Sequence, residues 1–472
     1  MNTLEITNQY SWLHTSDDDL KTTLWKLLRC RAKDYFHNQR FRMHLWDGYD
    51  NFFNKDSGRF LTGLLPEVRL VLKKKEIPYE IKDDRSFRWS VEKISDNFLN
   101  EGPNPVKQLR DYQVDYVNQT IKNWRGLITS PTASGKTNTM KAIIKALPPK
   151  TPTLILANKK SLIDQNYDEI KSLGIDWVGR LYGNEKKPNY ITCATSQSAH
   201  LLKPVLSKIK VLIVDEVHEM MSKVPKRIYN SLKNAVVRVG MSATAFKFGG
   251  KDESQKFMVK GYFGPVFYTK STDDGKLTTK ELIERDILST ADCTFYRITE
   301  PKLPYEIYLD AVTKGVAEND YFHKIVVSLA KKLPGRTLII VERLEHGDRL
   351  HDMIPGSLWV RGEDKLETRK EVIKKLKNET DDIIAIASSG IFNTGIDIYC
   401  HSLINAAGGQ ADHAIIQRFG RGLRRAKDKQ HLQYFDFVFE TNEYLQKHSW
   451  KRVKILEKEG HNVTVLGEGI LP

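Results

Sequence analysis

The strongest chemical signal in the chain is a run of small residues that ends in Gly-Lys-Thr. The apolar pair Leu127 and Ile128 precedes this run, and a helical pattern from Met140 to Leu147 follows it. A strand, a small-residue loop and a helix in this order form a phosphate-binding loop, where backbone amides and a lysine bind phosphate and a hydroxyl holds Mg²⁺. We expect the triphosphate of a nucleotide to bind Ser130, Thr132, Ala133, Ser134, Gly135, Lys136 and Thr137, the last of which also holds the metal.

Two adjacent acids follow a later apolar run. Val211 to Val214 leads into Asp215 and Glu216, with His218 shortly after. The carboxyl ends of parallel strands meet at one edge of a sheet, so we expect these acids near the phosphate-binding loop. Asp215 is then a ligand for Mg²⁺ through its water shell, and Glu216 is the catalytic group that polarises the attacking water. A polar cap on a strand end is the alternative, and the upstream loop argues against it.

A pair of hydroxyl residues closes another apolar run. Ser242 and Thr244 flank Ala243 directly after the run Val236 to Met241. Together with His218, we expect these hydroxyls to couple the acidic motif to the state of the γ-phosphate. Taken alone the pattern is weak, because small hydroxyl residues often close a strand.

A basic motif near the C-terminus could complete the nucleotide site. It begins at Gln417 and contains Arg421 and Arg424, which share one face if the segment is helical. The planar guanidinium binds two phosphate oxygens at once and stays charged in a cleft. We therefore expect Gln417, Arg421 and Arg424 to be catalytic, with the two arginines acting as arginine fingers. A solvated basic helix that touches DNA is the alternative.

Composition points to a polyanionic partner. The chain has 472 residues, enough for two or three domains, and a formal net charge of +15. Nucleic acid is the first candidate partner, and the alternative is that the positive charge serves solubility alone. The four cysteines are far apart and have no metal-ligand spacing, which favours buried thiols. No leader or membrane-spanning run is evident, so we expect a cytoplasmic protein, in the host cytoplasm if a phage encodes it, with no membrane partner.

Two successive series of alternating strands and helices predict two parallel-sheet α/β domains. The expected domains are a small α+β N-terminal module, residues 1–104, and two α/β domains, residues 105–290 and 291–472. A turn-rich linker, residues 100–105, marks the first boundary, and residues 273–304 are expected to join the later two. Apolar runs predict the following strands: 153–157, 190–194, 211–214, 236–241, 337–341, 358–360, 383–387, 403–406 and 434–438.

In order and spacing these motifs resemble the helicase superfamily 2 signature from about Leu109 to Arg425. The resemblance implies two tandem RecA-like domains that bind ATP and Mg²⁺, and it makes residues 215–218 the DExH motif. Arg110 and Gln113 look like the glutamine motif that reads adenine, which the amide geometry supports. Motif V supplies Thr394 for nucleic acid, and Gly395 and Asp397 for the nucleotide. The strand-contacting positions of motifs Ia and Ic are Asn158, Lys159, Thr195 and Gln197.

The first module carries a nearer resemblance. Residues 39–42, Gln-Arg-Phe-Arg, and residues 45–48, Leu-Trp-Asp-Gly, are similar to the N-terminal domain of phage UvsW-type recombination helicases. That group remodels branched DNA, which implies branch migration, fork regression and duplex unwinding. Arg40, Arg42 and Trp46 then offer phosphate-binding charge beside a ring that stacks on bases. The alternative is that the aromatic residues are core and the arginines are solvated.

Three other functions stay open from the sequence. The same motor suits an RNA or RNA–DNA hybrid helicase, because backbone contacts carry it. A translocase subunit of a restriction or repair assembly would pump duplex without separating strands. A nucleotide-gated scaffold is the third, and the presence of Glu216 with paired arginines argues against it.

Overall fold

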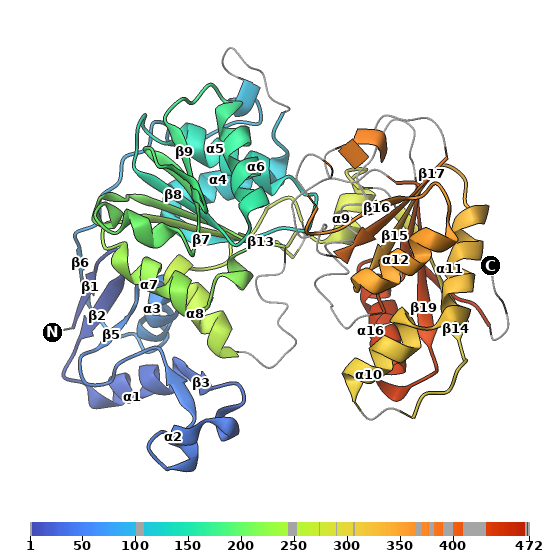
Figure 1. Ribbon diagram of the computed structural model, residues 1–472. Coiled ribbons are helices and arrows are strands. Elements are labelled where there is room, and N and C mark those ends of the chain that lie inside the picture. Colours follow the sequence, from blue (N-terminus) through green and yellow to red (C-terminus); the bar gives the residue numbers. More distant parts are fainter. Residues whose placement is uncertain are drawn as a thin grey trace. The chain divides into compact units, whose positions relative to one another are not determined.

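The computed structural model divides the chain into two compact units (Figure 1). The first comprises residues 1–130 and 135–277, and the second comprises residues 131–134 and 278–472. The expected three-domain division with its boundaries stays a prediction. The residues that the structure describes are 2–100, 108–243, 253–272, 274–288, 290–304, 307–364, 368, 371–372, 374–376, 382–389, 400–408, 431–467 and 470.

The N-terminal module is a four-stranded sheet covered by two helices. Helix α1 (Asp18–Leu27) begins where the carboxylate of Asp17 accepts the amide of Leu20 at 2.8 Å, and it buries Leu20 and Leu24. Helix α3 (Leu65–Lys74) buries its own apolar face in the same core. The strands, in sheet order, are β5 (Arg59–Leu61), β2 (Tyr10–His14), β1 (Thr3–Ile6) and β6 (Glu80–Asp83).

A separate hairpin extends from this module. It pairs β3 (Arg29–Arg31) with β4 (Tyr49–Asn51) and carries the short helix α2 (Gln39–Arg42) between them. In Figure 1 this hairpin lies at the end of the first unit, away from the large sheet. Below, residues 34–48 are called the N-terminal tip.

The large sheet of the first unit has seven strands, and all neighbours pair in parallel except the edge pair β10 and β9. All four predicted strands of this region are present within one residue of their expected starts, because they are buried on both faces. The edge strands β9 and β10 were not predicted. In sheet order the strands are β10 (Glu185–Lys187), β9 (Val178–Tyr182), β11 (Ile191–Thr195), β8 (Thr153–Ala157), β12 (Val211–Asp215), β13 (Val237–Ser242) and β7 (Arg125–Thr129).

Helices cover both faces of this sheet (Figure 1). One face carries α4 (Asp111–Asn123), α5 (Lys136–Ala146) and α6 (Lys160–Lys171). The other carries α7 (Lys223–Ser231) and α8 (Glu253–Phe263), whose Tyr229, Val259 and Phe263 form one core cluster with strand residues such as Leu156 and Val214. Leu61 of the N-terminal module belongs to that cluster too, so the two parts share a core.

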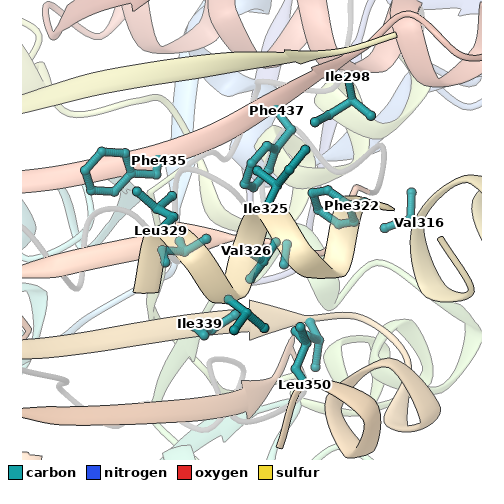
Figure 2. Packing of buried hydrophobic residues seen from close by; sticks show 14 of the residues in the cluster. Ile298, Val316, Phe322, Ile325, Val326, Leu329, Ile339, Leu350, Phe435 and Phe437 are labelled. Carbon is teal, nitrogen blue, oxygen red and sulfur yellow. The ribbon is translucent and has the colours of Figure 1, made fainter. Parts of the chain in front are cut away.

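The second unit repeats the architecture with another seven-stranded sheet. Its helices are α9 (Thr279–Glu284), α10 (Tyr308–Val312), α11 (Asp320–Lys332), α12 (Leu344–Met353) and α16 (Glu443–Lys458). Phe322, Ile325 and Leu329 of α11 pack on Ile339 and Phe437 of the sheet (Figure 2). In sheet order the strands are β16 (Leu358–Val360), β17 (Ile383–Ser388), β15 (Arg336–Val341), β18 (Ser402–Asn405), β19 (His431–Phe439), β14 (Thr290–Ile298) and β20 (Asn462–Val465).

One segment differs from expectation. Residues 273–304 were expected to join the domains, yet they contain α9 and β14, and β14 pairs with both β19 and β20 inside the sheet. All four cysteines are buried, as predicted. Within the part of the chain that the structure describes, no helix has the length and apolarity to cross a bilayer.

Candidate nucleotide and nucleic-acid site

The phosphate-binding loop joins β7 to α5. Gly135 caps α5 with a φ of +87°, and Ala133 also has a positive φ, +64°. A Cβ at Gly135 would lie 2.5 Å from Nε2 of Gln113, so a larger residue would displace that amide. The Nζ of Lys136 donates to the Ser130 carbonyl at 3.0 Å, which holds the ammonium over the loop. Thr137 is in the first turn of α5, and Thr132 and Ser134 are in the loop itself.

Gln113 ties α4 to this loop. Its Oε1 accepts the backbone amide of Arg110 at 2.9 Å, and its Nε2 donates to the Gly135 carbonyl at 3.0 Å. The side chain is 1% exposed. The guanidinium of Arg110 donates to the Tyr112 hydroxyl at 3.1 Å. Both residues of the expected glutamine motif therefore lie beside the loop, and the adenine-reading role stays a prediction.

Asp215 ends β12 and Glu216 follows it, on the same sheet edge as the loop. The amide of Glu216 donates to Oδ1 of Asp215 at 3.0 Å, and Glu216 has a φ of +49°, which turns the chain sharply after the strand. Burial and then the charge of Glu216 hold the pKa of Asp215 well above its ordinary value, while the Lys136 ammonium opposes the shift. The sequence-based expectation that loop and acids would meet at one edge agrees with this geometry.

A single serine hydroxyl bridges the acidic motif. Ser242 ends β13, and its hydroxyl donates to Oε2 of Glu216 at 3.3 Å and lies 2.6 Å from Nδ1 of His218. Because the Ser242 hydroxyl uses its hydrogen to donate to Glu216, its oxygen accepts a hydrogen bond from the Nδ1–H of His218. The amide of Ser130 also donates to the Ser242 carbonyl at 3.1 Å. Ser242 thus touches both the start of the loop and the acidic motif.

Glu219 is a residue that the sequence analysis missed. Its carboxylate accepts a hydrogen bond from the side-chain amide of Asn158 at 3.2 Å, and Nζ of Lys159 lies 4.0 Å from Oε1 of the same carboxylate. Nε2 of His218 is also 4.0 Å from this carboxylate. The expected motif Ia residues therefore contact the acidic motif through Glu219. Its place directly after His218 was the available signal, but acids at that position are common on solvated turns.

Gln255, on α8, is the second missed residue. Its Nε2 donates to the His218 carbonyl at 3.1 Å. A pocket of about 460 Å³ lies between α8, the acidic motif and the β3–β4 hairpin, and Lys33, Asp50 and Lys226 are among its lining residues. No local pattern points to Gln255, because only the tertiary fold brings α8 to His218.

The remaining expected DNA contacts differ in exposure. Thr195 is buried at the end of β11, while Gln197 is exposed just beyond it. In the N-terminal tip Arg40 and Arg42 are both exposed, and Arg42 donates through Nε to the Phe36 carbonyl at 3.0 Å. Trp46 is half-buried and donates to the Tyr49 carbonyl at 2.8 Å. These bonds give Arg42 and Trp46 a part in the fold of the tip.

Several expected site residues lie outside the described part of the chain. Their roles stay predictions, and they are Thr244, Thr394, Gly395, Asp397, Gln417, Arg421 and Arg424.

The residues present fit a magnesium nucleotide. Mg²⁺ prefers oxygen ligands and usually takes one or two protein groups plus phosphates, which the Thr137 hydroxyl and the Asp215 carboxylate can supply. A cation beside Asp215 would also relieve the charge that raises its pKa. Lys136 and the start of α5 provide positive potential for phosphate.

Comparisons with known proteins agree with this reading. Residues 106–247 match the family described as "Type III restriction enzyme, res subunit". The DNA 3'-5' translocase XPB2 of Sulfurisphaera tokodaii is 26% identical over 407 residues, covering 75% of this chain and 88% of the relative. The ATP-dependent DNA helicase uvsW of Enterobacteria phage T4 is 25% identical over 444 residues, covering 86% of this chain and 84% of the relative.

Solved structures show the fold. The ATP-dependent Type ISP restriction-modification enzyme LlaBIII bound to DNA has a TM-score of 0.56 at 16% identity, covering 85% of this chain and 34% of that one. Dbp5 of S. cerevisiae, bound to RNA, has a TM-score of 0.51 at 15% identity, covering 74% and 88%. The chain has the tandem RecA-like fold, its relatives are DNA helicases and translocases, and it resembles the superfamily 2 helicases of the UvsW type.

Proposed function

We propose that the chain is an ATP-dependent DNA helicase or translocase that remodels branched DNA by branch migration, fork regression and duplex unwinding. Such an activity would serve recombination, repair or replication. The observation that carries the proposal is the connected cluster at one sheet edge, where Lys136, Glu216 and Ser242 lie on neighbouring elements. The names of two relatives, a DNA translocase and a DNA helicase, support DNA as the partner.

Each residue of the cluster has a distinct part in this proposal. Lys136 and Thr137 bind phosphate and metal, and Asp215 binds the metal. Glu216 is held by the Ser242 hydroxyl in a position to orient and polarise the attacking water. Bound Mg²⁺ would supply charge neutralisation of the phosphates. Arg421 and Arg424 would complete the site, so that hydrolysis depends on closure of the domains.

Duplex translocation without strand separation is the second candidate. The match of residues 106–247 to a restriction-enzyme subunit and the name of the XPB2 relative, a DNA translocase, favour it. The same cluster would power either activity, since both consume ATP along a DNA backbone.

A substrate panel distinguishes the two candidates. ATP turnover and strand displacement would be measured on forks, four-way junctions, R-loops, RNA–DNA hybrids and tailed duplexes, with Lys136→Ala as the inactive control. We expect DNA to stimulate turnover, and branched DNA to be processed faster than tailed duplex. Displacement of a triplex-forming strand with no separation of the duplex would favour translocation alone. No stimulation of turnover by any DNA would contradict the proposal.

A further inference from the structure

The N-terminal tip carries three large apolar side chains on its surface. Phe36 is 52% exposed, Met43 is 57% exposed and Leu45 is 63% exposed. Exposed apolar residues are ordinary when scattered singly, but a group of them marks a binding surface. These three lie within the short segment that connects β3 to β4.

The exposure is not the result of a loose fold, because the tip has a core of its own. The rings of Tyr35 and Phe41 pack edge to face with centroids 4.7 Å apart. Gly48 lies against them with a φ of +79°, and a Cβ there would be 2.9 Å from the Tyr35 ring. Trp46 is fixed by its bond to Tyr49. The tip therefore half-buries three aromatic residues, Tyr35, Phe41 and Trp46, and presents the apolar Phe36, Met43 and Leu45 to solvent.

The base of the tip is stiffened by stacked arginines and rings. The guanidinium of Arg29 lies 3.9 Å from the ring centroid of Trp25 and 3.8 Å from that of Tyr49. Arg31 lies 4.4 Å from the Tyr35 ring and 4.6 Å from the Tyr49 ring. Such cation–π contacts are attractive, and they hold the apolar surface in a preformed shape.

The charge around the tip suits a polyanion. Lys33 and Arg40 are exposed, while the carboxylate of Asp47 is engaged by Arg29 at 2.7 Å. The whole chain carries a net charge of +15. DNA is a polyanion that also offers flat apolar surfaces, but only where a base pair ends or opens. A duplex end at a branch point matches both features of the tip.

We propose that the N-terminal tip is a wedge for the junction between duplex and single strands. Phe36, Met43 and Leu45 cover or separate the last base pair, as apolar side chains do when they enter a base step. Arg40 and Lys33 bind the flanking phosphates. The inference rests on the proposed function and adds the part of the molecule that opens the branch.

The contacts behind the tip connect it to the nucleotide site. Phe52, next to β4, stacks on Phe257 of α8 with ring centroids 5.2 Å apart, and the Ser254 hydroxyl donates to Asp50 at 2.5 Å. Gln255, on the same helix, donates to the His218 carbonyl. One helix therefore contacts both the wedge hairpin and the acidic motif. A rigid path of this kind lets force from the motor act at the tip.

The test uses the full chain and a fork with 2-aminopurine in its last base pair. Binding of the wild type without ATP should raise the fluorescence, because the base loses its stacking. The variant Phe36→Ser/Met43→Ser/Leu45→Ser should lose this rise and unwind forks about tenfold more slowly, the loss expected from a stacking contact. A matched variant, Leu70→Ser/Ile81→Ser, removes exposed apolar residues (51% and 53% exposed) elsewhere in the same module and should behave as wild type.

Two further measurements separate the possible outcomes. ATP turnover on single-stranded DNA reports the motor itself, and sedimentation reports the oligomeric state. If the triple variant keeps both the fluorescence rise and the unwinding rate, the wedge is wrong. If it only changes the sedimentation, the apolar tip is a protein interface and the wedge is again wrong. If the wild type neither binds forks nor responds to any DNA, the proposed function itself fails.

Discussion

Each seven-stranded sheet carries a cluster of buried polar groups, and the two clusters are built differently. In the first, Glu216, His218 and Ser242 meet at a strand end, where the Ser242 hydroxyl contacts the other two and Nδ1 of His218 also lies 3.3 Å from Oε2 of Glu216. In the second, the carboxylate of Asp436 in β19 is enclosed by donors. Arg452 contributes Nε at 3.0 Å and Nη2 at 2.9 Å, and the Asn405 amide and Tyr434 hydroxyl add bonds of 2.8 and 2.7 Å.

The difference shows what each cluster is for. Asp436 and Arg452 are 0% and 1% exposed, and together they fix α16 to the sheet, so any movement would leave a buried charge unpaired. The first cluster lies at a sheet edge, where the Glu216 side chain is 19% exposed and the turn at Glu216 has a positive φ. Small changes at the nucleotide can rearrange it at modest cost. One cluster is suited to hold a structure and the other to change state.

The largest effect should come from Glu216→Gln, which keeps the shape of the first cluster and removes its base. We expect DNA-stimulated ATP turnover to fall roughly 10²- to 10⁴-fold, the usual contribution of a general base. Steady-state phosphate release measures it, and nucleotide binding by calorimetry should stay near wild type. Glu80→Gln, an exposed carboxylate on β6, is the matched control. Wild-type turnover in Glu216→Gln would disprove the water-activation role.

In the second cluster, Asp436→Asn should destabilise the fold and leave the nucleotide chemistry alone. The substitution leaves the Arg452 guanidinium buried without its charge partner, which costs about 3–5 kcal/mol. Hydrogen exchange at increasing urea, read on peptides from β14, β19 and α16, measures the loss. Asp292→Asn removes an exposed carboxylate from β14 and should cost far less. Equal protection in the two variants would refute the structural role.

The sequence predicted the first cluster better than the second for a physical reason. Strands β12 and β13 are buried along most of their length, so they read as mainly apolar runs that end in Asp215 and Ser242. Strand β14 alternates exposed and buried residues along much of its length, and it was therefore expected to be part of a connection. The Asp436–Arg452 pair joins residues from a strand and a helix that no local pattern relates.

In the N-terminal tip, too, the sequence alone does not determine which side chains are exposed. Its sequence predicts aromatic and basic residues at a surface, but the chain could expose either Phe41 and Trp46 or Phe36 and Leu45. The tertiary contacts decide the matter: Phe41 packs against Tyr35 and Gly48, and Trp46 donates to the Tyr49 carbonyl, so both are half-buried. Glu219 and Gln255 were missed for a related reason, since their contacts depend on how α8 and the motif Ia segment pack.

The second unit should lose stability as the pH falls below neutral. Burial and then the neighbouring His323 lower the pKa of His346 to about 3, from an ordinary 6.5. Below pH 6.5 the His346 imidazole is therefore protonated in the unfolded chain but stays neutral in the folded chain, so stability is lost as the pH falls. One such imidazole removes about 2 kcal/mol between pH 7 and pH 5.

The variant His346→Leu tests this assignment, because it fills the site beside Phe322 without a titrating group. Urea unfolding followed by hydrogen exchange on α11 and β15 peptides should show a smaller loss of stability between pH 7 and pH 5 than in the wild type. Above pH 7 the two proteins should respond alike to pH. The same acid slope in both would show that His346 is not the source.

The smallest effect should come from Ser242→Ala. This variant tests most directly whether the first cluster changes state. A hydrogen bond of this kind contributes about 0.5–1.5 kcal/mol, so ATP turnover should fall only a few fold. Because the Ser242 hydroxyl contacts both Glu216 and His218, and His218 contacts α8 through Gln255, fork unwinding should fall further than ATP turnover. The measured quantity is the number of base pairs opened per ATP consumed. Ser11→Ala removes an equally buried hydroxyl, bonded to Thr62 in the N-terminal sheet, and should leave that ratio unchanged. A proportional loss of both activities in Ser242→Ala would mean that the bridge only positions Glu216 and carries no signal toward the tip.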